Sequence, residues 1–275
     1  MKSEVLASAV GLFVFLGQLR AGDAMSEGEA LTALKPFGPV ATTDRSQQDS
    51  PVVRLVFPPN TPKKLSNADL VHLKSLSRLR SLDLGGQPLT DACLPYIAAL
   101  PELEELNLNW NKVTATGVVG LVKDRTKMQR LELSGVPIHD DDLAALNVLT
   151  ELRHLGLRRT LVSDAGMAHL KAFPKLRNLS LMHTAITDKG LTHLAELKSL
   201  EDLDLERTAI TDVGLAHVRG LTNLRRLQFA HTAVTDAGLE HLLDLTKLTI
   251  LNVGSTQVTK GGLEKLRQRL PNLQK

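Results

Sequence analysis

Aromatic residues are scarce in this sequence of 275 residues: they make up 3% of it, with one Trp and one Tyr. A compact domain normally uses large rings to fill irregular space in its core. The overall composition, 43% hydrophobic and 23% charged, is nevertheless that of a folded protein. The core must therefore be built from Leu, Val, Ile and Ala, which favours a repetitive architecture.

Cysteine and net charge are also low. The single cysteine, Cys93, excludes an intrachain disulfide framework and a cysteine-rich metal site. A formal net charge of +3 is too small to indicate the many phosphate contacts of a nucleic-acid binder. The sequence also lacks G-x-S-x-G, phosphate-loop, dinucleotide-binding and H-E-x-x-H motifs. We expect no enzymatic activity, no cofactor, no metal and no nucleic-acid partner.

The longest apolar run lies at the N-terminus, over Val5–Leu16, and follows Lys2. It is short for a membrane span, which needs about 20 residues. Small residues follow at Gly22 and Ala24, as near the cleavage site of a secretory signal peptide. Residues 1–24 are therefore predicted to be a signal peptide, and the protein to be exported to the periplasm, cell envelope or surroundings. The alternatives are a retained membrane anchor and, if the run is no signal, a cytoplasmic protein.

The rest of the chain is repetitive. Residues 176–197 read LRNLSLMHTAITDKGLTHLAEL, and residues 200–221 read LEDLDLERTAITDVGLAHVRGL. Repeats begin 24 residues apart, except for one interval of 25 between Leu103 and Met128. Their first apolar residues are Leu79, Leu103, Met128, Leu152, Leu176, Leu200, Leu224 and Leu248. Such a period indicates stacked supersecondary units.

Each unit contains two patterns. L-x-x-L-x-L alternates apolar and polar residues, so Leu179 and Leu181 should point inward from a strand. Apolar residues then recur every third position at Leu191, Leu194 and Leu197, as on one face of a helix. Thr187 is positioned to cap this helix, Asp188 to place a carboxylate at its positive end, and Gly190 to allow close packing.

Stacking such units gives a curved protein. Parallel strands lie about 4.8 Å apart, whereas packed helices need about 8–10 Å. The stack must bend with the sheet on its inner side, so the outward strand residues should line a concave face.

The pattern L-x-x-L-x-L-x-x-T-x-I-T-D-x-G-L-x-x-L, over residues 52–270, resembles the leucine-rich-repeat superfamily. The T-x-I-T-D-x-G-L turn is similar to secreted or envelope-associated bacterial members and to F-box-type adaptors, although nothing before residue 52 resembles an F-box. The resemblance implies an α/β fold: a right-handed horseshoe of about nine repeats, with a concave parallel sheet and convex short helices, used in protein recognition. Residues 25–51 would form a helical lead-in and linker, and residues 52–275 the repeat domain.

Two recurring columns have a structural explanation. Asn111, Thr160, Thr184, Thr208, Thr232 and Thr256 can bond backbone groups between units. His72, His169, His193, His217 and His241 share one helical position, but helices 8–10 Å apart do not easily bring two rings to one metal ion. We interpret the histidine column as facing solvent. The regular turn is interrupted where Ala115 and Lys260 replace Asp, and where Cys93 replaces Gly.

The residue before the threonine column varies, and reads Trp110, Gly135, Arg159, His183, Arg207, His231 and Ser255. Basic neighbours about 4.8 Å apart in a sheet repel one another unless a counter-charge is present. A partner could supply that charge. Alternatively, nearby acids supply it: Glu201, Asp202, Asp204 and Glu206 lie in the unit of Arg207, and Arg177, Glu201 and Arg225 alternate in one column.

Trp110 stands at an exposed-type position, where an aromatic side chain would either contact a partner or cover the end of the sheet. Tyr96 is expected to pack inside. The candidate partner-binding residues are Trp110, Asn109, Glu132, His154, Arg158, Arg159, Met182, His183, Asp204, Glu206, Arg207 and His231.

We therefore expect a monomeric, non-enzymatic module that binds a protein or other extended ligand through its concave face. Two alternatives remain open. One is a spacer or assembly protein of the cell envelope, with residues 39–51 as a flexible connection, and the other is a substrate adaptor of the F-box type.

Overall fold

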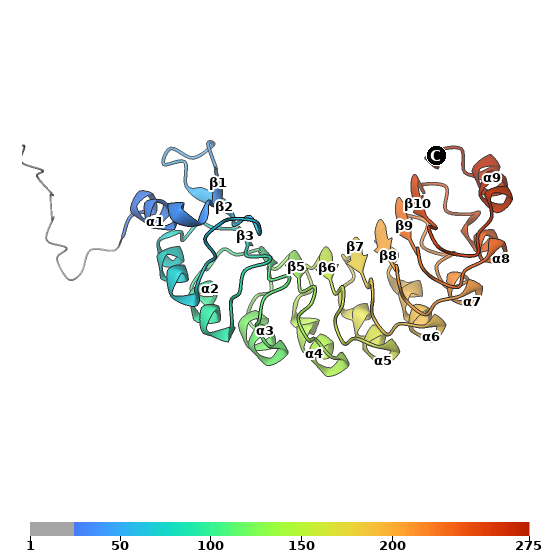
Figure 1. Ribbon diagram of the computed structural model, residues 1–275, viewed down its shortest axis with the longest axis horizontal. Coiled ribbons are helices and arrows are strands. Elements are labelled where there is room, and N and C mark those ends of the chain that lie inside the picture. Colours follow the sequence, from blue (N-terminus) through green and yellow to red (C-terminus); the bar gives the residue numbers. More distant parts are fainter. Residues whose placement is uncertain (1–24, 275) are drawn as a thin grey trace, which may run out of the picture.

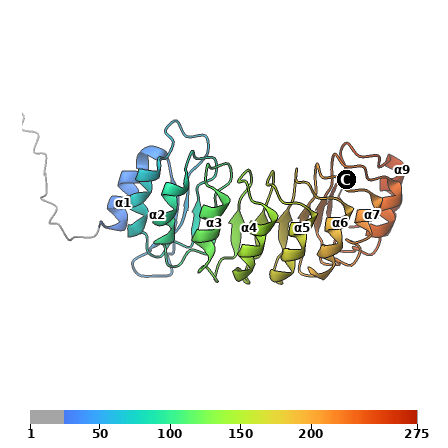
Figure 2. The same cartoon turned by 90° about the horizontal axis from the view of Figure 1, so that it is seen from below.

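The computed structural model describes residues 25–274. It is an arc, with strands along the inner side and helices along the outer side (Figure 1). The helices lie next to one another over the convex face (Figure 2). The curvature follows from the mismatch between strand spacing and helix spacing. The predicted signal peptide, residues 1–24, lies outside the described residues.

One sheet of ten strands runs in chain order from β1 to β10, and its neighbours from β2 onward are parallel. Each strand from β2 to β10 belongs to one repeat, which gives the nine repeats predicted from the sequence. The strands are β1 (Val40–Thr43), β2 (Val52–Val56), β3 (Ser81–Asp83), β4 (Glu105–Asn107), β5 (Arg130–Glu132), β6 (His154–Gly156), β7 (Asn178–Ser180), β8 (Asp202–Asp204), β9 (Arg226–Gln228) and β10 (Ile250–Asn252).

The helices are short. The α-helices are α1 (Glu27–Leu34), α2 (Leu94–Ala98), α3 (Ala115–Val122), α4 (Asp140–Ala145), α5 (Asp164–Met167), α6 (Asp188–Leu191), α7 (Asp212–Leu215), α8 (Asp236–Leu239) and α9 (Lys260–Arg269). Turns of 3₁₀-helix are η1 (Lys35–Phe37), η2 (Asn67–Ser75), η3 (Asp91–Cys93), η4 (Leu146–Val148), η5 (Ala168–Ala172), η6 (Thr192–Glu196) and η7 (Glu240–Leu242).

The core lies between the sheet and the helices and consists mainly of leucine. The middle leucine of each strand pairs in register with its counterpart in the next repeat, as Leu179 does with Leu155 and Leu203. Leu191 in α6 and Leu194 in η6 are fully buried. No single repeat could bury this strip of side chains alone, so stacking supplies most of the stability.

The N-terminal edge of the sheet differs from the sequence prediction. Residues 39–51 were expected to form a flexible connection, but Val40–Thr43 forms β1, which pairs antiparallel with β2. The Asp44 backbone N–H then donates to the Pro51 carbonyl, 2.9 Å away, and its carboxylate accepts from Ser46. All four residues of β1 are exposed, so the strand carries no alternating apolar pattern. Its role is to pair the outer edge of β2.

Adjacent repeats are connected by a ladder of Asp–Thr hydrogen bonds on the helix side. The Asp188 carboxylate accepts from both the backbone N–H and the hydroxyl of Thr211 in the next repeat, each at 2.7 Å. Thr187 caps α6 as predicted, by accepting from the Lys189 N–H. The same arrangement joins Asp91 to Thr114, Asp140 to Ser163, Asp164 to Thr187, Asp212 to Thr235, and Asp236 to Thr259.

The recurring glycine makes room for this ladder. A Cβ at Gly190 would lie 2.5 Å from the Asp164 carboxylate oxygen of the previous repeat. The ladder is interrupted where Ala115 replaces the aspartate, and there Asp142 stands in place of the glycine and accepts from the His139 N–H. Without the incoming carboxylate, this repeat does not need a glycine.

Candidate partner-binding surface

The candidate residues fall into two groups. Glu132, His154 and Asp204 belong to strands β5, β6 and β8 on the concave face. The other nine lie just beyond the carboxyl ends of the strands, because each strand is only three residues long. We call one column of this turn the edge stripe: Trp110, Gly135, Arg159, His183, Arg207, His231 and Ser255. The sequence places the stripe within the sheet, and the structure corrects this to the turn at its edge.

The edge stripe lies in the turn because of its backbone conformation. All seven residues of the edge stripe have positive φ, from 53° at Arg159 to 77° at Gly135. This left-handed region suits glycine, and other residues occupy it at a cost of about 1–2 kcal/mol each. The corresponding residue before the stripe is Gly86, also with positive φ. Six non-glycine residues therefore occupy a turn position that glycine would fill with less strain.

The edge stripe is also regularly spaced, because its backbone continues the hydrogen-bond ladder of the sheet. The Arg159 N–H donates to the Met182 carbonyl at 3.0 Å, and the His183 N–H donates to the Glu206 carbonyl at 2.8 Å. Arg207 and His231 bond the following repeats in the same way. Consecutive stripe residues are thus held about 4.8 Å apart.

Trp110 lies over the turn of the next repeat. A Cβ at Gly135 would come within 2.5 Å of the Trp110 ring, so the ring occupies the space above that glycine. The Arg158 and Arg159 guanidinium groups lie 5.8 and 5.9 Å from the ring centroid. Trp110 remains 47% exposed. It therefore covers a turn in the middle of the sheet edge, with two guanidinium groups over its ring and nearly half of its surface exposed.

The charges of the edge stripe are not neutralised within the described residues. Between residues 25 and 274, no carboxylate lies within 4.0 Å of the basic groups of Arg158, Arg159 or Arg207. The Arg207 guanidinium lies 3.2 Å from Nε2 of His231. Two acids of the repeat that carries Arg207 bond other groups: Glu206 accepts from the Asn252 side chain, and Asp204 accepts from the Ser180 hydroxyl at 3.0 Å.

The concave sheet contrasts with its edge, because two of its arginines contact carboxylates. Arg130 contacts Glu132 at 2.8 Å, and Arg226 contacts Asp202 at 3.5 Å. A hollow of about 280 Å³ lies here, and Glu132, His154 and Gly156 are among the residues that line it. The Glu132 carboxylate occupies the place that a side chain at Gly156 would take.

Burial perturbs the ionisable groups of this sheet. It raises the pKa of the Glu132 and Asp204 carboxyls and lowers the pKa of His154. The Arg130 guanidinium opposes the shift at Glu132. Among the residues described, no group of three or more His, Cys, Asp or Glu side chains is arranged to hold a metal ion.

Comparisons with known proteins agree with this geometry. The leucine-rich-repeat family model matches residues 100–122, 174–195, 196–216, 220–243 and 244–266. Two crystal structures from Listeria monocytogenes share the fold. Internalin C2 is 22% identical, with a TM-score of 0.56 and 89% of each chain covered, and an internalin, InlF, is 18% identical, with a TM-score of 0.52, 89% of this chain and 86% of that chain covered. No curated protein matches the sequence significantly.

The chain contains leucine-rich repeats and adopts the leucine-rich-repeat fold.

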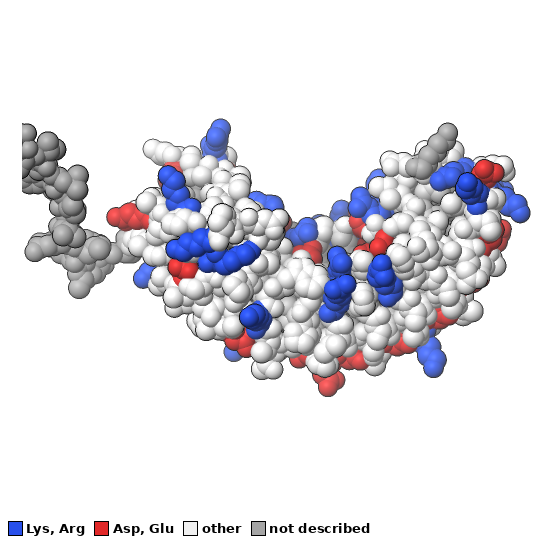
Figure 3. Space-filling view, viewed as in Figure 1, with Lys and Arg blue, Asp and Glu red and all other residues white. Residues whose placement is uncertain are grey.

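The opposite edge of the repeat stack, before the strands, shows internal neutralisation. Glu201 lies 3.1 Å from Arg177 and 3.7 Å from Arg225, which confirms the alternation predicted from the sequence. In Figure 3, basic side chains are spread over the flank that faces the viewer, and acidic side chains gather mainly along the convex border. The arginines of the edge stripe have no such carboxylate neighbour within residues 25–274.

The threonine column bonds the backbone, but within units, where the sequence predicted bonds between units. The Thr160 hydroxyl donates to the Leu157 carbonyl at 2.7 Å, and later members repeat this bond. The bond lies within a unit, whereas Asn111 accepts from Leu89 and so connects two units. The histidines lie on the helix side, His193 exposed and the other four partly buried. Cys93 is buried, and burial raises the pKa of its thiol to about 12.

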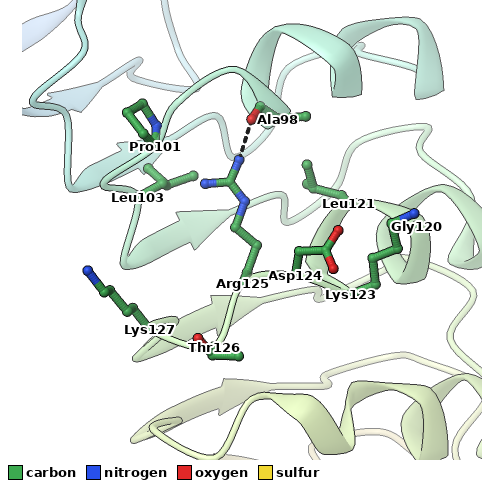
Figure 4. A pocket seen from close by; sticks show the side chains of 10 residues that line it. All are labelled: Ala98, Pro101, Leu103, Gly120, Leu121, Lys123, Asp124, Arg125, Thr126 and Lys127. Carbon is green, nitrogen blue, oxygen red and sulfur yellow. Dashed lines mark hydrogen bonds between the residues drawn. The ribbon is translucent and has the colours of Figure 1, made fainter.

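Another hollow, of about 400 Å³, lies between the repeats of α2 and α3 (Figure 4). Arg125 reaches across it and donates to the carbonyl oxygens of Ile97, Ala98 and Leu100 at the end of α2. This residue sits in the longer repeat of 25 residues, and its guanidinium caps the preceding helix. We interpret the hollow as part of the repeat junction.

One exposed feature could have been found in the sequence but was not. Leu161, two residues beyond Arg159, is 54% exposed. It belongs to an apolar row that runs beside the edge stripe and consists of Pro137, Leu161, Ala185, Ala209 and Ala233, all exposed. The sequence indicates this feature by a leucine at a repeat position that otherwise carries small or polar residues.

Proposed function

We propose that this leucine-rich-repeat protein is a non-enzymatic module that binds a protein partner through the edge stripe and the adjoining concave face. The observation that carries the proposal is the left-handed column. Arg159, His183, Arg207 and His231 keep large polar side chains at positions where glycine is less strained. Since their backbone hydrogen bonds would form equally well with glycine, the side chains have a use outside the fold.

Electrostatics supports the same surface. The arginines at the stripe lack carboxylate partners within the described part of the chain, and the Nε of Arg158 is buried there without a hydrogen-bond partner. Trp110 offers an exposed ring, the kind of side chain that is enriched at the centre of interfaces. We infer that a partner supplies the missing acceptors.

The spacer or assembly alternative has less support. It depended on a flexible connection over residues 39–51, and this segment instead forms β1 and a hydrogen-bonded turn. The adaptor alternative has no second domain to support it within residues 25–274.

We also propose that the protein acts outside the cytoplasm, because Val5–Leu16 and the small residues after it resemble a secretory signal. Among residues 25–274, no helix is long and apolar enough to cross a membrane. Expression with the natural leader and N-terminal sequencing of the product tests this: a chain that begins at Met25 supports export, and an intact Met1 in a cytoplasmic fraction contradicts it.

Capture experiments test the binding function. The chain carrying Trp110→Ser, Arg159→Ser, His183→Ser and Arg207→Ser is compared with the parent as bait in the extract of its native compartment. We expect the variant to keep its circular dichroism spectrum and to lose the specifically captured protein. Matched substitutions of exposed lysines on the helix side, Lys74→Ser, Lys171→Ser and Lys189→Ser, should leave capture unchanged. Undiminished capture by the stripe variant would contradict the proposal.

A further inference from the structure

Two parallel rows at the sheet edge define what kind of partner segment would fit. The edge stripe supplies cations, and the apolar row beside it supplies Leu161 and a line of exposed alanines. The buried threonine column separates the rows. The combination favours a segment that carries both carboxylates and small apolar residues.

The backbone of this edge offers little for β-strand addition. The N–H groups of Arg159, His183 and Arg207 already donate to the next repeat, at 2.8–3.0 Å. The Leu161 N–H likewise donates to the Ile138 carbonyl, at 2.9 Å. A partner must therefore be recognised through side chains, and its own backbone must not require hydrogen bonds from this edge.

The spacing of the arginines limits which conformation of a partner segment would fit. Arg159 and Arg207 are separated by two ladder steps, which is about 9.6 Å. A polyproline II segment rises about 3.1 Å per residue with three residues per turn, so residues i and i+3 lie on one face about 9.3 Å apart. This conformation also forms no internal backbone hydrogen bonds.

We propose that the edge binds an extended acidic segment of a protein partner, in a polyproline II-like conformation, whose carboxylates three residues apart pair with Arg159 and Arg207. His183 lies between the two arginines, and the exposed face of Trp110 receives an apolar side chain from one end of the segment. This inference rests on the proposed function and adds the chemistry and the spacing of the ligand.

A peptide of four Glu-Pro-Ala repeats is the probe. Its binding is followed by the fluorescence of Trp110, the only Trp of the chain, and by the anisotropy of a labelled copy. Two peptides serve as comparisons. One has Gln for every Glu, and the other has the same composition with its glutamates in two adjacent pairs separated by three other residues, so that no two glutamates lie three positions apart. We expect saturable binding of the first peptide, about tenfold weaker binding of the peptide with paired glutamates, and none of the Gln peptide.

The protein variants are chosen to keep the fold intact. Arg159→Gly and Arg207→Gly together place glycine in a conformation that it adopts without strain, and we expect them to weaken binding of the spaced peptide by about tenfold or more. Lys171→Ser with Lys189→Ser removes two exposed charges from the helix side and should change nothing. Higher salt should weaken binding to the parent.

Several outcomes would overturn the inference. They are equal binding of the Gln peptide, equal binding of the two acidic peptides, and an unchanged affinity of the double-glycine variant. Preferential binding of polyphosphate or duplex DNA through the same arginines would also overturn it, since the site would then recognise polyanions. If no peptide binds but the stripe variant still loses its native partner in the capture experiment, the proposed function stands and this inference fails. If the stripe variant keeps that partner, the proposed function fails.

Discussion

The Trp110 ring lies over Gly135 of the next repeat, within 2.5 Å of where a Cβ at that glycine would be. Gly135 also has a φ of 77°. Two independent reasons, the ring and the backbone, therefore require glycine at this place. They also fix the ring beside Arg158 and Arg159.

Gly135→Ala is the corresponding substitution. The new methyl group must displace the ring and occupy a left-handed conformation, so we expect a loss of about 1–2 kcal/mol in the free energy of unfolding. Trp110 fluorescence should shift in the folded state. Gly120→Ala in α3 is the matched control, because nothing lies within 4 Å of a Cβ there. Equal stability of the two variants, measured by urea unfolding, would show that the ring does not occupy this space.

Glycine in the edge stripe should have the opposite effect. Arg207→Gly relieves about 1–2 kcal/mol of backbone strain, against about 0.5–1 kcal/mol for the greater freedom of the unfolded chain. We expect equal or higher stability, with a net gain of up to about 1 kcal/mol. Lys189→Gly, in the right-handed backbone of α6, should instead lose about 1 kcal/mol. A clear loss of stability in Arg207→Gly would mean that the arginine supports the fold itself.

Most of the fold could be predicted from the sequence, whereas the turn position of the edge stripe and strand β1 could not. Leu179 and its counterparts repeat with a fixed period, and only stacking buries them, so the sequence specifies the solenoid. Trp110, Arg159 and Arg207 are not residues that indicate a left-handed turn, so the end of each strand was not recognised in the sequence. Gly86 and Gly135 in the same column were the available signal. Strand β1 was missed because all of its residues are exposed.

The Asp–Thr ladder gives a third prediction. Asp188→Ala leaves the N–H and the hydroxyl of Thr211 without their acceptor, and we expect a loss of about 1–3 kcal/mol in unfolding free energy. Asp124→Ala, at an exposed position in a loop, should stay within about 0.5 kcal/mol of the parent. Thermal unfolding followed by circular dichroism measures both. Similar melting temperatures for Asp188→Ala and Asp124→Ala would show that the Asp–Thr ladder does not stabilise the fold.

Because the Glu132 carboxyl is buried, we expect the free energy of unfolding to depend on pH. Burial raises its pKa above the ordinary value of 4.5, so the folded chain holds the proton more tightly than the unfolded chain. The stability it contributes is present below pH 4.5 and is lost as the pH rises through the folded value. Glu132→Gln should therefore unfold at higher urea concentration than the parent near pH 7, and the difference should vanish at about pH 4. The same urea midpoint for Glu132→Gln and the parent at both pH values would contradict this account.

Site-specific crosslinking tests the central claim, binding through the sheet edge, most directly. A photoreactive benzoylphenylalanine replaces His183 in the edge stripe or, in a parallel sample, Lys189 on the helix side. After irradiation with the extract of the native compartment, we predict one adduct of defined mass from position 183 and none from position 189. An adduct from position 189 alone would place the partner on the convex face and contradict the account.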